Sequence, residues 1–114
     1  MVINTSRVLA RKILKDINNK KIILYERDKN IEFIEKYSIS TETINEIIYS
    51  LTEDYFIERI DNKDPKIKCI YLYVFNVIYE FTDIYGESLK KVYIKIGEIE
   101  EGILLVSFHD IDYY

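Results

Sequence analysis

The chain has 114 residues and a net charge of −4, and 48% of its residues are hydrophobic while 32% are charged. This length suits one compact domain, so we expect residues 1–114 to fold as a single unit. The composition argues against a disordered chain, and no apolar run reaches the roughly 20 residues of a membrane-spanning helix. The N-terminus lacks the apolar stretch of a signal peptide, which predicts a cytoplasmic protein with no membrane partner.

Residues that commonly hold cofactors are scarce. A lone cysteine, Cys69, excludes an internal disulfide, and together with a lone histidine, His109, it argues against a zinc site. The three glycines form neither of the two common glycine-rich phosphate-binding motifs, so a nucleotide-driven enzyme of the usual kinds is not expected. We therefore expect no cofactor and no metal ion.

Charge divides the chain unevenly. Residues 1–30 carry a net charge of +5, whereas residues 31–114 carry −9. The basic part could meet nucleic acid or an acidic partner protein, although a solvated helix face better explains any one of its lysines taken singly. The 11 tyrosines are better explained by a coding bias than by a surface that stacks nucleic-acid bases.

Capping residues and apolar spacing predict a helix near the N-terminus. Thr5 or Ser6 can cap this helix, which ends at residues 18–19. Its apolar positions follow helical spacing: Leu9, Ala10, Ile13, Leu14 and Ile17. The short apolar run over residues 22–25 that follows is typical of a strand.

Two further helices are expected before the middle of the chain. Asn30 is the expected cap of a short helix that turns Ile34 and Tyr37 inward. Ser40 is the expected cap of the next helix, although capping-box spacing at Thr43 leaves its exact start open. The apolar stripe of this helix has the spacing i, i+3, i+4, i+7: Ile44, Ile47, Ile48 and Leu51.

The second half of the sequence predicts strands. We expect them over four ranges: 55–60, 67–81, 92–99 and 103–108. Turn-forming residues separate these ranges at 61–66, 83–88 and 100–102. Because helices come first and strands follow, we expect an α+β domain whose helices pack on one face of an antiparallel sheet.

The last two strands predict a hairpin that gathers polar side chains. Counting outward from a three-residue loop at 100–102 gives these opposed pairs: Ile99 with Ile103, Lys95 with Ser107, and Tyr93 with His109. Alternation then places one apolar set of the last strand against the helices: Leu104, Val106 and Phe108. The more polar and open face carries the other set: Tyr93, Lys95, Ser107 and His109.

An imidazole beside a phenol and an ammonium group suggests acid–base chemistry. His109 is the one side chain here whose ordinary pKa lies near neutrality. One member of the trio could take the proton from a 2′-hydroxyl of RNA, another could protonate the leaving oxygen, and a cation could stabilise the phosphate. Taken singly, cross-strand packing explains Tyr93, and solvent exposure explains Lys95.

Two motifs stand near the C-terminus: residues 92–96, Val-Tyr-Ile-Lys-Ile, and residues 103–109, Ile-Leu-Leu-Val-Ser-Phe-His. This pattern resembles that of the MqsR family, the mRNA interferase toxins of bacterial toxin–antitoxin pairs. Upstream, the matching segments are 26–30 with Phe33, 44–51 with Asp54-Tyr55, and the aromatic strand motif at 73–76, Tyr-Val-Phe-Asn. In order and approximate spacing they cover most of the chain.

This resemblance implies a RelE-like fold, cleavage of single-stranded mRNA without a metal ion, and control by an antitoxin protein. Tyr93 matches the family's strand tyrosine that is implicated in catalysis, and His109 falls where the family places Lys or His. Asn76 lies near the position of a family polar residue. Glu58 stands at or near the family's basic position with the opposite charge, and Arg59 is the candidate to replace it.

A second interpretation is an interaction protein without catalytic activity on the same scaffold. It could be a degenerate toxin that still binds its partner, or an acidic inhibitor whose carboxylates take the place of phosphates. The features that suggest the inhibitor are carboxylates expected near the site: Glu58, Glu98, Glu100, Glu101, Asp110 and Asp112. A small domain with purely structural tyrosines and histidine is the third interpretation.

Overall fold

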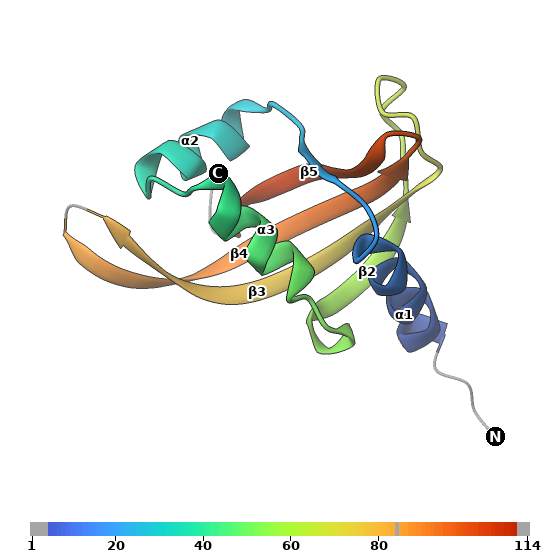
Figure 1. The fold of residues 1–114 in the computed structure, drawn as a ribbon, viewed down its shortest axis with the longest axis horizontal. Helices are drawn as coiled ribbons and strands as arrows, with labels where there is room; N and C mark the ends of the chain where they lie inside the picture. Colours follow the sequence, from blue (N-terminus) through green and yellow to red (C-terminus); the bar gives the residue numbers. More distant parts are fainter. Residues whose placement is uncertain (1–4, 84, 112–114) are drawn as a thin grey trace.

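The computed structural model describes residues 5–83 and 85–111, which form a five-stranded sheet with helices packed against it (Figure 1). In chain order the elements are α1 (Thr5–Ile17), β1 (Ile22–Leu24), α2 (Asp28–Lys36), α3 (Thr41–Tyr49), the 3₁₀ turn η1 (Glu53–Tyr55), β2 (Phe56–Asp61), β3 (Tyr71–Asp83), β4 (Gly86–Ile99) and β5 (Gly102–Asp110). The predicted α+β class, with helices before most strands, is confirmed. No helix in this part of the chain is long and apolar enough to cross a membrane.

The sheet has the strand order β1-β5-β4-β3-β2 and is mixed rather than purely antiparallel. Strands β2 to β5 pair antiparallel with their neighbours, but β1 pairs parallel with β5. The expectation of an antiparallel sheet was therefore wrong at this edge. Residues 25–101 separate β1 from β5, and such a long connection allows a parallel pairing that a tight turn cannot make.

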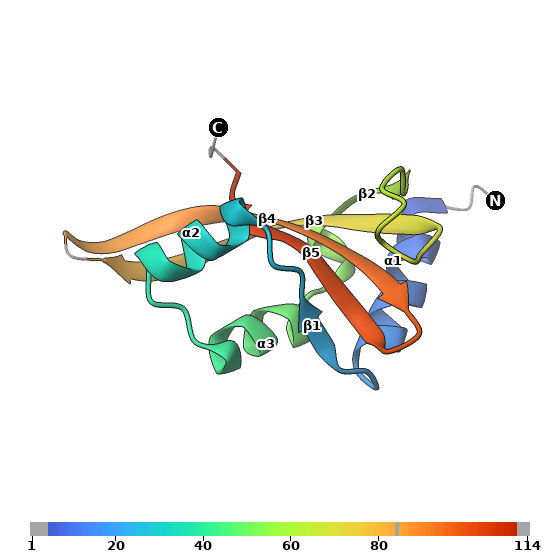
Figure 2. The same cartoon turned by 90° about the horizontal axis from the view of Figure 1, so that it is seen from above.

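The helices bury the positions that their spacing indicated. Figure 2 shows α1 and α3 on the same side of the sheet, where Ile13 and Ile17 of α1 are almost completely buried. The predicted cap of α3 is confirmed, because the hydroxyl of Ser40 accepts a hydrogen bond from the backbone N–H of Thr43 at 3.1 Å. Thr5 already belongs to α1, so any cap of that helix precedes the described residues.

Two strands begin elsewhere than predicted. β3 starts at Tyr71, not at residue 67, because Asn62 holds the preceding residues in a loop. The Asn62 side-chain amide donates to three backbone carbonyls, those of Asp64, Ile67 and Cys69, at 2.8–3.2 Å. β4 starts at Gly86, not at residue 92, so β3 and β4 extend past the other strands as a two-stranded arm (Figure 1).

Apolar side chains pack on both faces of the sheet. The larger core lies under the helices and includes Phe75, Ile94 and Phe108, all of them completely buried. A smaller apolar cluster lies on the opposite face and combines four buried residues: Ile67, Leu72, Leu104 and Val106. Because Ile67 belongs to it, the loop between β2 and β3 covers part of the face that was expected to be open.

Candidate active site

The β4–β5 hairpin contains two of the three predicted pairs, but the predicted pair of Ile99 with Ile103 was wrong. Ile99 lies opposite Gly102, so the turn consists of two residues, 100–101, and the predicted three-residue loop was wrong. The ladder then shifts: Ile96 lies opposite Leu105 but Lys95 lies opposite Ser107. Val106 is the extra residue of a β-bulge, and it restores the pairing that the shorter turn had displaced.

Beyond the bulge, the pairing agrees with the prediction that Lys95 lies opposite Ser107 and Tyr93 opposite His109. The face assignment of β5 was wrong in part, however. Phe108 belongs to the core under the helices as predicted, but Leu104 and Val106 belong to the cluster on the other face. Leu105, which was expected on the open face, belongs to the core. A bulge places two consecutive side chains against a single opposed residue, so strict alternation fails at this point.

Tyr93 and His109 lie side by side on the face opposite the main core. Their rings stack with centroids 5.5 Å apart and an interplanar angle of 27°. Tyr93 is half-buried, whereas only 9% of the surface of His109 is exposed, so the imidazole is more enclosed than an open face would make it.

The orientation of the imidazole follows from its hydrogen bond. Nδ1 of His109 lies 3.0 Å from the carbonyl oxygen of Asp110. A carbonyl only accepts, so in the neutral ring Nδ1 carries the hydrogen and donates it. Nε2 is then the nitrogen with a lone pair, and it is the one that can take up a proton.

Three cations from two parts of the chain lie around the ring pair. Arg27 precedes α2, and its guanidinium donates to the Ser107 hydroxyl at 3.1 Å. Lys95 comes from β4 beside Tyr93, and Lys29 from the first turn of α2. Arg27 and Lys29 belong to the basic N-terminal part of the sequence, so the fold carries positive charge onto the strands of the acidic part.

These surroundings shift three pKa values, each in a direction that favours the neutral form. Burial lowers the pKa of His109, and the charges of Lys29, Arg27 and Lys95 lower it further against the opposing hydrogen bond to Asp110. Burial also lowers the pKa of Lys95, again helped by Arg27 and Lys29. For Tyr93, burial and the nearby carboxylate of Glu58 raise the pKa against the opposing effect of Arg27.

Asn30 was expected to cap α2, but it instead holds α2 against the bulge of β5 by hydrogen bonds. That expectation was wrong, because α2 already begins at Asp28 and Asn30 lies within its first turn, completely buried. The Asn30 amide donates to the carbonyl of Val106 at 3.0 Å, and its oxygen accepts from the N–H of Phe108 at 2.8 Å. The side chain thus takes the place of a neighbouring strand along this stretch of β5.

Two predicted site residues have different outcomes. Asn76 lies opposite Tyr93, on β3. Its Oδ1 is buried and has no hydrogen-bond partner among the described residues. Arg59 does not join the ring pair, because its guanidinium lies over the ring of Tyr71, 3.9 Å from the centroid. Its neighbour Glu58 is the β2 residue that acts on Tyr93.

Most of the carboxylates that suggested an acidic inhibitor are not gathered at the site. Glu98 pairs with Lys20 at 3.2 Å, and Asp110 pairs with Lys90 at 3.5 Å. Glu100 and Glu101 form the turn at the other end of the hairpin, and Asp112 lies outside the described residues. Of this set, Glu58 is the carboxylate whose effect on Tyr93 marks it as a neighbour of the ring pair.

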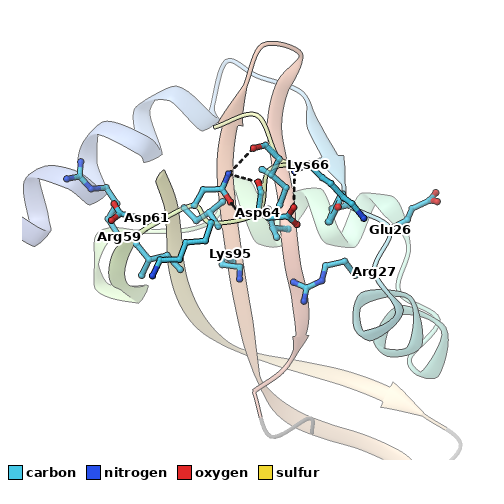
Figure 3. A pocket seen from close by; sticks show the side chains of 14 residues that line it. Glu26, Arg27, Arg59, Asp61, Asp64, Lys66 and Lys95 are labelled. Atoms are coloured by element: carbon cyan, nitrogen blue, oxygen red, sulfur yellow. Dashed lines mark hydrogen bonds between the residues drawn. The ribbon is translucent and has the colours of Figure 1, made fainter. Parts of the chain in front are cut away.

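A groove of about 910 Å³ adjoins the cations. Arg27 and Lys95 line one side of it, and Asp64 and Lys66 of the loop between β2 and β3 lie across from them (Figure 3). The apolar part of the lining comes from the smaller cluster and includes Val106. Since Lys95 lies two residues from Tyr93 along β4, the groove opens next to the ring pair.

Sequence reasoning missed Arg27, Lys29 and Asn30 as parts of this site. The excess of positive charge in residues 1–30 was the signal for the first two, but it did not indicate where they would lie. Nowhere in residues 5–83 and 85–111 do three or more His, Cys, Asp or Glu side chains gather as metal ligands would.

Comparison with known proteins identifies no relative: no family model, no curated protein and no solved structure matches this chain.

Proposed function

We propose that this chain is an endoribonuclease that cuts single-stranded mRNA by acid–base catalysis, with the RelE-like scaffold and antitoxin partner of an MqsR-type toxin. The observation that carries the proposal is the stacked pair of Tyr93 and His109 on one sheet face, with Arg27, Lys29 and Lys95 around it. A phosphodiester is the substrate that such a site suits, because cations stabilise the phosphate while one ring accepts a proton from the substrate and the other donates a proton to it.

The pKa directions assign the two proton-transfer roles. The lowered pKa of His109 keeps the imidazole neutral near pH 7, so Nε2 can take the proton from a 2′-hydroxyl. The raised pKa of Tyr93 keeps the phenol protonated, so it can donate to the leaving oxygen. Two neighbouring groups whose pKa values move apart are a common basis for such a division of roles.

The reaction that follows is an internal displacement at phosphorus. The 2′-oxygen forms a bond to phosphorus as His109 removes its proton, and the bond from phosphorus to the 5′-oxygen breaks. Tyr93 protonates that 5′-oxygen, which leaves a cyclic 2′,3′-phosphate and a free 5′-hydroxyl. Lys95 and Arg27 offset the charge that develops on the non-bridging oxygens.

The test is cleavage of single-stranded RNA by purified protein in the presence of a chelator. We expect His109→Ala and Tyr93→Phe each to lower the rate by about 10²–10⁴-fold, because each removes a proton-transfer group. Tyr55→Phe is a matched control, since Tyr55 is an exposed tyrosine in η1 away from β4 and β5. Circular dichroism would verify that the variants fold. Equal rates for the parent and both site variants would refute this assignment.

One observation favours a second candidate, an interaction protein that keeps the scaffold without the activity. Glu58 places a carboxylate near Tyr93, where it opposes the approach of a phosphate. In that case neither the parent chain nor its Glu58→Gln variant would cleave RNA, while an antitoxin encoded by the neighbouring gene would still bind. The acidic inhibitor receives less support, because its other described carboxylates lie in ion pairs or at the distant turn.

A further inference from the structure

We infer that the groove beside Arg27 and Lys95 binds the stretch of single-stranded RNA that flanks the scissile phosphate, with Lys63 and Lys66 as its outer phosphate contacts. The inference rests on the proposed function, because it takes the ring pair as the place where the chain is cut. It goes further in assigning a binding role to the loop between β2 and β3.

Continuity with the ring pair is the first argument. Lys95 and Arg27 belong both to the cation cluster around His109 and to the groove lining. A polymer whose phosphate lies against these two cations continues on one side into the groove. A small anion would occupy the cluster alone and leave the groove of about 910 Å³ unexplained.

The lining of the groove suits a nucleotide chain. Its apolar lining includes Leu72 and Val106 of the smaller cluster, together with Ile60, which packs against that cluster. Its walls carry five cations and three carboxylates, so positive charge is in excess. Sites for single-stranded nucleic acid usually combine a positively charged groove with aromatic side chains on which bases stack, and here Tyr25 supplies an aromatic side chain.

The loop that carries Lys63 and Lys66 is held in one conformation before anything binds. Asn62 fixes it through its three donated bonds, and the Asn62 oxygen also accepts from the N–H of Asp64 at 3.0 Å. Oδ1 of Asp64 in turn accepts from the N–H of Lys66 at 2.9 Å (Figure 3). A fixed wall lowers the entropic cost of binding a flexible strand.

The first measurement is binding, which does not depend on cleavage. A labelled 2′-O-methyl dodecamer of randomised sequence would be titrated by fluorescence anisotropy against the parent and a Lys63→Gln, Lys66→Gln double variant. We expect about tenfold weaker binding and a shallower salt dependence, by about 1.4 in the logarithmic slope. The matched control is Lys12→Gln with Lys15→Gln, which removes two exposed lysines of α1 and should leave affinity within about twofold.

The second measurement separates the groove from the chemistry. A dinucleotide is long enough to occupy the ring pair but not the groove. The double variant should therefore cleave a randomised dinucleotide pool at the parent's rate, while the KM of the variant for the dodecamer RNA rises about tenfold. Equal effects of both lysine pairs on binding would overturn the groove assignment. If the parent prefers an acidic peptide such as polyglutamate to RNA, the groove takes a protein segment and the inference is wrong.

The two proposals can fail separately. If the dodecamer binds through Lys63 and Lys66 but no substrate is cut, the groove is an RNA-binding site without a cleavage site beside it, and the nuclease assignment is wrong. If the parent cuts dinucleotide and dodecamer alike and the lysine pair changes neither KM nor binding, the nuclease stands and the groove falls. Because both lysines are exposed, the double variant should keep the parent's melting temperature.

Discussion

The β4–β5 hairpin has two halves that differ in what lies against them on the face opposite the main core. In the half next to the turn, Leu104 and Val106 are buried beneath the loop between β2 and β3. In the far half, Tyr93 and His109 stack beside cations supplied by the start of α2. The bulge at Val106 lies between the two halves, and it lets one strand serve an apolar cluster and a polar site in succession.

The far half depends most on the hydrogen bonds of Asn30, so removing them should have the largest effect on stability. Asn30→Ala leaves the carbonyl of Val106 and the N–H of Phe108 without their partner, and we expect a loss of about 3 kcal/mol in the free energy of unfolding. Thermal denaturation would record a melting temperature lower by about 10 °C or more. Asn45→Ala, at a half-buried position of α3, is the control and should change stability by about 0.5 kcal/mol at most. Equal losses in the two variants would contradict the role of Asn30.

The turn-proximal half depends on a close backbone approach instead. A Cβ at Gly102 would lie 2.4 Å from the carbonyl oxygen of Lys21, and the residue has a φ of +154°. We therefore expect Gly102→Ala to cost about 2 kcal/mol in urea denaturation. Gly86→Ala should cost about 1 kcal/mol from its φ of +111° alone, since nothing lies within 4 Å of its Cβ position. A larger loss of stability in Gly86→Ala than in Gly102→Ala would mean that the close approach to Lys21 does not determine the cost at Gly102.

The charge near the ring pair in the far half can be changed without altering the packing there. Glu58→Gln removes the exposed carboxylate that raises the pKa of Tyr93, so that pKa should fall. RNA binding, measured by anisotropy, should tighten by about twofold to threefold because one repulsive charge is gone. Glu101→Gln changes the same charge at the distant turn and should have little effect on binding. If both variants tighten binding equally, the response reports net charge and not the site.

The smallest expected effect concerns the protonation of His109. It is the single histidine of the sequence, so its imidazole signals in an NMR titration need no assignment by mutation. We expect its pKa below the ordinary value of about 6.5, because burial and three cations disfavour the charged ring. Cleavage, which needs neutral imidazole, should therefore persist below that pH and decline only as the pH falls through the lowered pKa.

Removing one of those cations should shift the pH at which cleavage declines on the acidic side. In Lys29→Gln the pKa of His109 should rise toward its ordinary value, so activity should decline at a higher pH than in the parent. Lys15→Gln on α1 serves as the control and should leave both the NMR titration and the profile unchanged. A downward shift of the pKa in Lys29→Gln would contradict the arrangement described here.

Much of the fold could be predicted from local patterns. Helical spacing located the buried residues of α1 and α3, and Ser40 caps α3 as expected. Tyr93 and His109 were predicted to be opposed neighbours, and they are. The reasoning nevertheless contained two errors that offset each other, because the turn is one residue shorter than expected and the bulge adds one residue back.

The sequence by itself determined what is local: which segments become helices or strands, and roughly where the hairpin turns. The bulge, on which the pairing of Tyr93 with His109 depends, was not predicted from the sequence. Only the tertiary structure decided that Arg27 and Lys29 reach this hairpin from the other end of the chain, and that Asn30 pairs with the backbone of β5. Helix and strand patterns arise from neighbouring residues through steric preference and backbone hydrogen bonding. Contacts between α2 and β5 depend on how whole elements pack, and no spacing within either segment encodes that.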